Sequence, residues 1–153
     1  MRIVEGVVVG GNQLGRKLGF PTANIAIDDT LDIENGVYAS KVLFEGREYA
    51  AMTNVGVRPS VDGSKRLLET HLFGFSGSLY GLKLRVELHE KIRDEKKFSS
   101  VEELRKQIAS DAEKIKNNIK KCLYVFILDV YLYNRSENNI ILYTFSYFST
   151  FTF

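Results

Sequence analysis

The sequence predicts a mainly β protein: a closed or nearly closed antiparallel β-barrel with one C-terminal amphipathic helix. Short runs rich in Val, Leu, Tyr, Phe and Thr recur through the first 90 residues, each bounded by Gly, Pro, Asn, Asp or Ser. This pattern is typical of strands joined by turns. A later segment changes to a period of three to four residues. Several evenly spaced strands favour a barrel, because closure removes the exposed edges of an open sheet.

Five strands are expected from these runs, and the last one shows the clearest alternation. There Leu84, Val86 and Leu88 alternate with charged or polar side chains, so one face should be buried and the other wet. Gly46 in FEGRE predicts a hairpin turn between the second and third strands. The expected strands are residues 3–10, 36–46, 48–55, 67–73 and 82–90.

Residues 98–119 form the one segment with helical periodicity. Ser100 and Glu103 have the spacing of a capping box at its start. We expect the apolar stripe of this helix to dock on the sheet or to close one end of the barrel. The stripe consists of Val101, Leu104, Ile108, Ala112, Ile115 and Ile119.

The composition of the chain changes near residue 120. All 12 glycines lie at or before Gly81, whereas the last 34 residues hold 10 of the 18 aromatic residues. We therefore divide the chain into a domain at 1–119 and an atypical aromatic-rich tail at 120–153. Two alternatives stay open for the tail. It is either translated AT-rich non-coding or frameshifted sequence, or a pair of extra strands at about 123–133 and 140–147.

Length, charge and cysteine content restrict the class of protein. The 153 residues suffice for one domain with a core. With 21 Lys and Arg against 19 Asp and Glu, no strong field attracts nucleic acid or anionic lipid, and we expect neither as partner. The lone Cys122 cannot form an intrachain disulfide, and no cationic leader opens the chain. No apolar run approaches the roughly 20 residues of a membrane span. We expect a cytoplasmic monomer.

The segment GGNQLGRKLGFPTAN, residues 10–24, has too many special residues for an ordinary turn. It matches neither the P-loop nor the dinucleotide fingerprint. Its glycines let backbone N–H groups approach an anion, and Arg16 and Lys17 add positive charge. Thr22 and Asn24, two apart in an extended segment, could present two neutral oxygens to one Mg²⁺. Alternatively, both side chains bond their own loop backbone.

Six motifs follow one another along residues 3–119: GRKLGFPTAN, GVYA, TNVGVRPSV, LLETHLFGF, LYG and IRDEKKFSSVEEL. In order and approximate spacing they resemble riboflavin kinase (flavokinase), including the C-terminal kinase module of bifunctional bacterial FAD synthetases. The resemblance implies a six-stranded antiparallel Greek-key β-barrel with a closing helix. It also implies transfer of the ATP γ-phosphoryl group to the ribityl 5′-hydroxyl of riboflavin, giving FMN and ADP. The tail has no counterpart in it, and FMN adenylylation is not expected of this sequence.

The resemblance also implies roles for individual residues. Glu69 corresponds to the catalytic carboxylate, which accepts the proton of the attacking hydroxyl. Thr22 and Asn24 correspond to the residues that hold Mg²⁺ and nucleotide phosphates. The other implied ATP-binding positions are Gly10, Arg16, Leu72, Gly74 and Tyr80, and the implied flavin-binding positions are Arg93, Lys96 and Phe98. Without the resemblance, this last group reads as a solvated charge cluster ahead of the helix.

Two more residues belong to the matching motifs. His71 shares a strand face with Glu69 and could neighbour it, but we interpret it as structural. NVGVRPSV looks like a turn of the family, and we expect Arg58 to be structural as well. The alternative to a kinase is a barrel that binds flavin or nucleotide without turnover, and the presence of Glu69 argues against it. An oligonucleotide-binding barrel would need a basic face, whereas residues 1–119 hold 18 basic and 17 acidic side chains.

Overall fold

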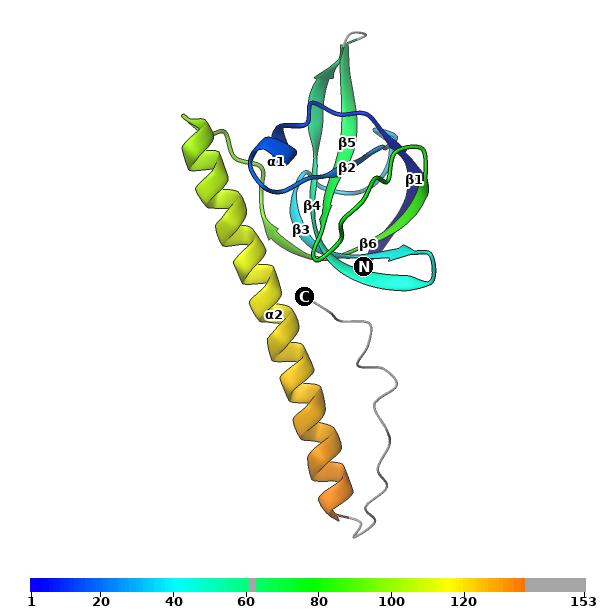
Figure 1. The fold of residues 1–153 in the computed structure, drawn as a ribbon, viewed down its shortest axis with the longest axis vertical. Helices are drawn as coiled ribbons and strands as arrows, with labels where there is room; N and C mark the ends of the chain where they lie inside the picture. Colours follow the sequence, from blue (N-terminus) through cyan, green and yellow to red (C-terminus); the bar gives the residue numbers. More distant parts are fainter. Residues whose placement is uncertain (61–62, 137–153) are drawn as a thin grey trace.

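The computed structural model describes residues 1–60 and 63–136 and confirms the mainly β architecture (Figure 1). The strands of this part form a closed antiparallel barrel in the spatial order β1-β2-β5-β4-β3-β6. Strands β3, β4 and β5 follow one another as hairpins, and the earlier strand β2 lies beside β5 at the end of this series. This arrangement is a Greek key. The strands are β1 (Arg2–Val9), β2 (Ala23–Ala26), β3 (Gly36–Phe44), β4 (Arg47–Ser60), β5 (Gly63–Leu72) and β6 (Lys83–Arg93).

Two of these strands differ from the sequence-based expectation. The short strand β2 was not among the five expected, and it forms because it pairs with both β1 and β5. The expected turn at NVGVRPSV is wrong, since β4 runs through Gly56 and Pro59 to Ser60. Its residues pair one by one with β5 as far as Ser60 opposite Gly63. Long-range pairing with β5 therefore overrides the local turn tendency of Gly and Pro.

The interior of the barrel follows the predicted alternation. Leu84, Val86 and Leu88 of β6 are at most 2% exposed. A row of hydroxyl groups also lies inside: Thr53 bonds Ser40 at 2.7 Å and Thr70 at 3.0 Å, so these buried polar groups satisfy one another. The predicted β3–β4 hairpin is present as well. Glu45 and Gly46 both have positive φ angles, 48° and 73°, as a two-residue type I′ turn requires.

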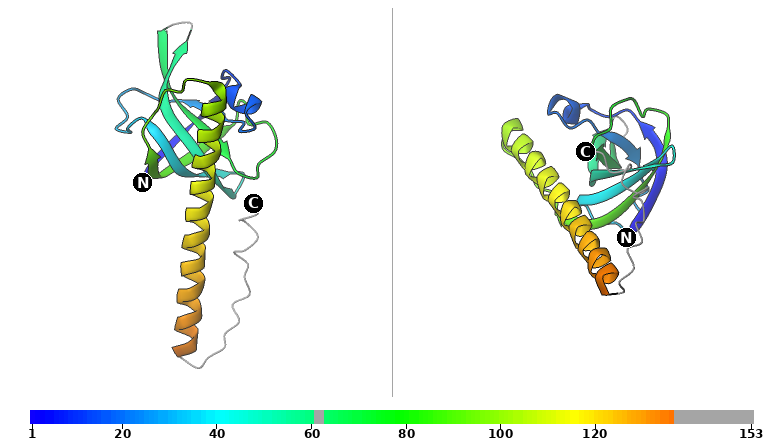
Figure 2. Two further views of the ribbon diagram at one scale, coloured as in Figure 1. Left: turned by 90° about the vertical axis from the view of Figure 1, so that its left-hand side faces the viewer. Right: turned by 60° about the horizontal axis from the view of Figure 1, so that its bottom comes forward.

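Helix α2 (Val101–Ser136) lies along the outer wall of the barrel (Figures 1 and 2). Ala112 and Ile115 are buried in a second apolar cluster that Ile108 and Ile119 complete. Val101 departs from the predicted stripe and is 60% exposed, because the first helical turn precedes the contact with the barrel wall.

The predicted capping box is half formed. Ser100 Oγ accepts a hydrogen bond from Glu103 N at 3.1 Å. The Glu103 carboxylate, however, accepts from both N and Oγ of Ser99. The reciprocal bond of the box is thus made one residue earlier than the sequence indicates.

The helix continues past the expected domain end to Ser136 and extends beyond the barrel (Figure 1). The extra strand expected at about 123–133 is therefore wrong, since the backbone there is helical. This run contains no Gly or Pro to interrupt a helix already started. The second strand, expected at 140–147, lies outside the described residues.

Among the residues that the structure describes, no helix has the length and apolar character of a membrane span.

Leucine-to-alanine substitutions test the barrel core. Leu68 on β5 is fully buried, whereas Leu43 on β3 is 39% exposed. We expect Leu68→Ala to lower the free energy of unfolding by about 2–5 kcal/mol, because it removes buried methyl groups and leaves a cavity. Leu43→Ala makes the same chemical change at the surface and should alter it by only about 0.5 kcal/mol. Urea denaturation measures both, and equal losses would contradict this assignment of the core.

Candidate functional site

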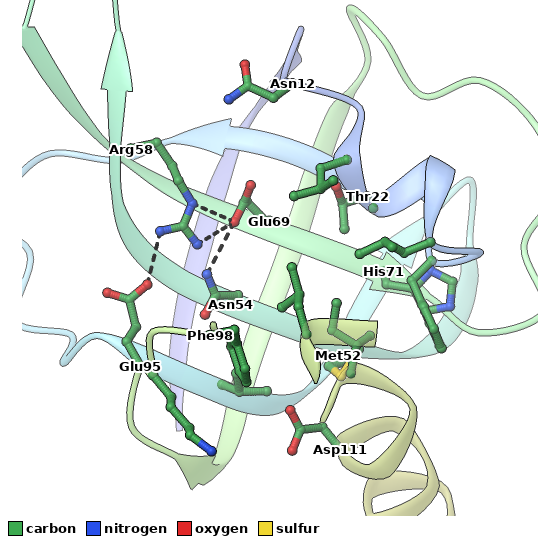
Figure 3. Close-up of a pocket in the computed structure, with 18 of the residues that line it drawn as sticks. Asn12, Thr22, Met52, Asn54, Arg58, Glu69, His71, Glu95, Phe98 and Asp111 are labelled. Atoms are coloured by element: carbon green, nitrogen blue, oxygen red, sulfur yellow. Dashed lines mark hydrogen bonds and ion pairs between the residues drawn. The ribbon is translucent and has the colours of Figure 1, made fainter. Parts of the chain in front are cut away.

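A cavity of about 360 Å³ lies between the outer wall of the barrel and the first half of α2 (Figure 3). Its residues come from four parts of the fold: the barrel strands β3, β4, β5 and β6, the loop before β2, the connection from β6 to α2, and α2 itself. The loop contains the one-turn helix α1 (Leu14–Lys17). A cavity of this size and mixed lining suits a small-molecule ligand.

The pairing register places three polar side chains in one row on the barrel wall. Asn24 of β2 is directly opposite Glu69 of β5, and Glu69 is directly opposite Asn54 of β4. Directly paired residues of antiparallel strands point to the same face, with Cβ atoms about 4.5–5.5 Å apart. Their sequence neighbours, such as Leu68 and Thr53, point into the barrel and are fully buried. The register therefore brings the predicted magnesium ligand Asn24 next to the predicted base Glu69.

Glu69 is held through one of its two carboxylate oxygens (Figure 3). Oε2 accepts hydrogen bonds from Arg58 Nη2 at 2.7 Å, Arg58 Nε at 3.0 Å and Asn54 Nδ2 at 3.2 Å. Within the described residues, Oε1 has no hydrogen-bond partner. The side chain lines the cavity and is 28% exposed. A carboxylate fixed at one oxygen with the other unengaged has the arrangement that a general base needs.

Arg58, which we expected from the sequence to be structural, belongs to this site. Its guanidinium lies between two carboxylates, because Nη1 also donates to Glu95 Oε1 at 3.0 Å. Burial alone would lower the pKa of Arg58, but hydrogen bonds and charge from Glu69 and Glu95 outweigh it and raise that pKa. Sequence reasoning missed this role because NVGVRPSV was interpreted as a turn. Interpreted as a strand, Asn54 and Arg58 share a face.

The glycine-rich loop lies directly against β2. A Cβ atom at Gly11 would collide with the Asn24 carboxamide, coming within 2.8 Å of its Cγ, whereas Gly10 faces open space. Gly11, one of the glycines expected to allow close approach to an anion, is thus the one that permits the loop to lie against Asn24. A Cβ at Gly15 would likewise collide with the Phe20 carbonyl. The two residues are also joined by a hydrogen bond from Phe20 N to Gly15 O at 2.8 Å.

The Asn24 side chain fits the predicted metal site. It is only 4% exposed, yet its carboxamide has no hydrogen-bond partner among residues 1–60 and 63–136. Buried polar groups without a partner are rare and costly in native proteins. No loop-backbone bond by the side chain of Thr22 or Asn24 is seen in this part of the chain. No group of three or more His, Cys, Asp and Glu that could hold a metal occurs there either. Thr22 and Asn24 are the residues that could hold Mg²⁺, since its usual protein ligands are oxygen atoms.

His71 connects β5 to the loop that carries Thr22. Its Nδ1 donates to the Pro21 carbonyl at 2.8 Å, and its ring makes edge contacts with Phe20 and Phe73. Burial lowers the pKa of His71 and so favours the neutral ring, although the bond to Pro21 opposes this shift. These contacts agree with the structural interpretation of His71.

The connection from β6 to α2 supplies the opposite side of the cavity. Arg93, Lys96 and Phe98, the three predicted flavin-binding residues, all line it. The Phe98 ring has the Arg93 guanidinium 5.8 Å and the Lys96 ammonium 5.5 Å from its centroid. Arg93 Nε donates to Asp111 Oδ2 at 2.8 Å, and Asp111 is buried on α2. Sequence reasoning missed Asp111, whose only signal was a charge beside the apolar stripe.

Thr22 lines the cavity, but Asn24 and the remaining predicted ATP-binding residues do not. Leu72 is 5% exposed in the barrel core, which leaves only its backbone for contact with a nucleotide. Gly74 follows β5 with a φ of 71°, and Tyr80 is 44% exposed on the next loop. Gly10 and Arg16 are exposed in the glycine-rich loop. The cavity thus gathers the predicted base and flavin-binding residues but few of the predicted ATP-binding ones.

Comparison with known proteins gives consistent matches over the barrel and the start of α2. The family model Flavokinase, described as riboflavin kinase, matches residues 2–119. The bifunctional riboflavin kinase/FMN adenylyltransferase of Buchnera aphidicola subsp. Schizaphis graminum is 46% identical over 116 residues, covering 74% of this chain and 37% of that protein. The RNA-binding riboflavin kinase RibR of Bacillus subtilis is 42% identical over 113 residues, covering 72% of this chain and 48% of that protein.

A solved structure of a riboflavin kinase also resembles this chain. The crystal structure of riboflavin kinase from Trypanosoma brucei superposes with a TM-score of 0.57 at 25% identity, covering 78% of this chain and 80% of that one. The chain spans little more than a third of the length of the Buchnera relative. The family model nevertheless covers well over half of the chain, including Thr22, Asn24 and Glu69. The chain therefore belongs to the riboflavin kinase family.

Proposed function

We propose that this chain is a riboflavin kinase that uses ATP and magnesium to convert riboflavin to FMN. The observation that carries the proposal is the row in which Glu69 stands beside Asn24, next to a cavity lined by Arg93 and Phe98. This row puts a candidate base, a candidate magnesium ligand and candidate flavin contacts within one site. Family membership makes the same activity the first to test.

Glu69 acts as the general base in this proposal. The O–H bond of the ribityl 5′-hydroxyl breaks as its oxygen attacks the γ-phosphorus of ATP, and the proton passes to Glu69. The bond between the γ-phosphorus and its bridging oxygen breaks, and ADP leaves. Oε1 is the oxygen that takes the proton, since Oε2 already accepts three hydrogen bonds. Positioning and charge neutralisation account for most of the catalysis of such a transfer.

Thr22 and Asn24 are the residues that would hold Mg²⁺. When bound, the ion supplies positive charge that neutralises the phosphate oxygens of ATP. The backbone N–H groups of the glycine-rich loop and the Arg16 guanidinium contribute further positive potential. In our proposal the nucleotide also contacts Gly10, the Leu72 backbone, Gly74 and Tyr80.

Riboflavin occupies the cavity in this proposal. Phe98 lies against the apolar isoalloxazine, and Arg93 donates to its polar edge, while Lys96 borders the same region. The Arg93–Asp111 bond holds the guanidinium in place from the side of α2. A barrel that binds flavin without turnover is not favoured, because Glu69 and Asn24 stand together beside the cavity.

Our proposals for the binding partners and the cellular location of the protein are less specific. The balanced charge of residues 1–119 supports small-molecule substrates, and we propose no nucleic-acid or membrane partner. The monomeric state and the cytoplasmic location stay predictions. We also propose that residues 1–119 are the catalytic domain, since the family match ends at 119 and Ile119 completes the apolar cluster under α2.

Glu69→Gln tests the catalytic base. We expect FMN formation to fall by about 10²–10⁴-fold, because the amide cannot take up the proton, while riboflavin affinity stays close to that of the unaltered protein. Chromatography measures FMN, and quenching of flavin fluorescence measures binding. Glu45→Gln, the same change in the exposed β3–β4 hairpin, is the control and should be fully active. Full turnover by Glu69→Gln would exclude Glu69 as the base.

Asn24→Ala tests the magnesium site. We expect the Mg²⁺ concentration for half-maximal activity to rise by at least about tenfold, because an oxygen ligand is lost. The melting temperature should barely change, since the carboxamide bonds no other described residue. Asn117→Ala, on the exposed side of α2, is the matched control. An unchanged Mg²⁺ titration, or a large drop in melting temperature, would contradict the assignment.

Truncation after residue 119 tests the domain boundary. We expect residues 1–119 to phosphorylate riboflavin as fast as the full chain, because every described side chain of the cavity is retained. Truncation after residue 107 serves as the comparison. It removes Asp111, Ala112 and Ile115, which are buried against the barrel, and should abolish activity. Loss of activity in the 1–119 protein would show that the tail belongs to the catalytic domain.

A further inference from the structure

One guanidinium joins two carboxylates that come from different parts of the fold (Figure 3). Arg58 on β4 donates through Nε and Nη2 to Glu69 on β5. It donates through Nη1 to Glu95, in the connection between β6 and α2. All three of its nitrogens are thus engaged with carboxylates in one fixed fork, a geometry that the single ammonium of lysine cannot reproduce.

The contact with Glu95 is built into the backbone of β4. Gly56 is buried two residues before Arg58, on the same face of the strand. A Cβ atom at Gly56 would collide with the Glu95 carboxylate and would lie 2.8 Å from Arg58 Nη1. The glycine therefore leaves room for the Glu95 carboxylate beside the guanidinium. The side chains of Arg58 and Glu95 are only 30% and 35% exposed.

We infer that Arg58 is the positioning residue for Glu69, and that Glu95 keeps Arg58 in place while Glu69 takes up the substrate proton. This inference rests on the proposed kinase function. In the resting site, Arg58 fixes Oε2 of Glu69 and leaves Oε1 to receive the proton. The bond that breaks is the O–H bond of the substrate hydroxyl, and the bond that forms is Oε1–H of Glu69.

Proton uptake changes the charge balance around Arg58. Glu69 becomes neutral, so its ion pair with Arg58 becomes an ordinary hydrogen bond. A half-buried guanidinium without a counter-ion is costly, because one partner of a desolvated pair has been removed. Glu95 stays ionised and remains paired with Arg58 at 3.0 Å. Because Glu95 still balances its charge, Arg58 can hold the Glu69 side chain in place during the proton transfer.

A purely structural ion-pair cluster is the competing explanation, and it makes different predictions. Loss of a structural pair lowers the melting temperature but leaves turnover at saturating substrate unchanged. Loss of a positioning residue lowers kcat while riboflavin affinity stays nearly constant. Since Glu95 acts only through Arg58 in our inference, its removal should have no further effect once Arg58 is gone.

The experiment compares Arg58→Lys, Arg58→Gln, Glu95→Gln and the double variant Arg58→Gln/Glu95→Gln in the full chain. We expect both Arg58 variants to lower kcat by about 10–100-fold, the loss typical of a slightly misplaced catalytic group. Riboflavin binding, followed by fluorescence quenching, should stay close to that of the unaltered protein. Glu95→Gln should lower kcat less, and the double variant should match Arg58→Gln. Arg47→Gln, at the exposed start of β4, is the control.

The outcomes separate this inference from the proposed function. If the unaltered protein forms FMN and Glu69→Gln does not, the kinase proposal stands. Unchanged kcat in Arg58→Lys would then overturn the role of Arg58. Independent, multiplying effects of Arg58→Gln and Glu95→Gln would overturn the role of Glu95. If Arg58→Gln fails to fold, Arg58→Lys and Glu95→Gln still test the roles of Arg58 and Glu95, because the first keeps the charge and the second keeps a hydrogen-bonding group in the cluster. Absence of FMN formation by the unaltered protein would overturn both proposals.

Discussion

The pairing register of β2, β5 and β4 is the constraint on which the candidate site depends. It sets Asn24, Glu69 and Asn54 side by side on the outer wall of the barrel. The same row continues through Val37 of β3 to Arg93 of β6. A slip of one residue would turn the whole row into the barrel. The fully buried side chains inside, Leu68 among them, prevent that slip, because it would expose them to water.

Helix α2 turns this row into a site by covering it. Ala112 and Ile115 pack against Val37, Met52 and Phe73 on the outer wall, and a cavity remains between the two surfaces (Figure 3). The connection that carries Phe98 must span from β6 to this helix, so it forms one side of the cavity. A bond from Arg93 to the buried Asp111 fixes the two ends of that connection relative to each other. Packing of the helix therefore also places Arg93 and Phe98, the residues that we propose to bind flavin.

The two candidate catalytic groups have opposite hydrogen-bonding states. Glu69 accepts three hydrogen bonds at one oxygen, whereas the buried carboxamide of Asn24 has no partner within the described residues. The second state leaves a desolvated polar group unsatisfied, so stability alone would not select it. Local departures of this kind are expected where a fold serves chemistry.

The fold class, the family and the candidate residues Glu69, Thr22 and Asn24 could all be predicted from the sequence. The alternation of Leu84, Val86 and Leu88 with polar residues shows which face of that strand is buried. The order of the motifs along the chain indicates the family without any knowledge of how the strands pair. The strand β2, the long course of β4, and the contacts of Arg58, Glu95 and Gly11 became visible only in the folded chain. The same holds for the helical course of α2 to Ser136. Local periodicity shows which face of a segment is buried, but not which distant segment pairs with it. The two carboxylate partners of Arg58 lie 11 and 37 residues further along the chain, and only the folded barrel brings all three side chains together.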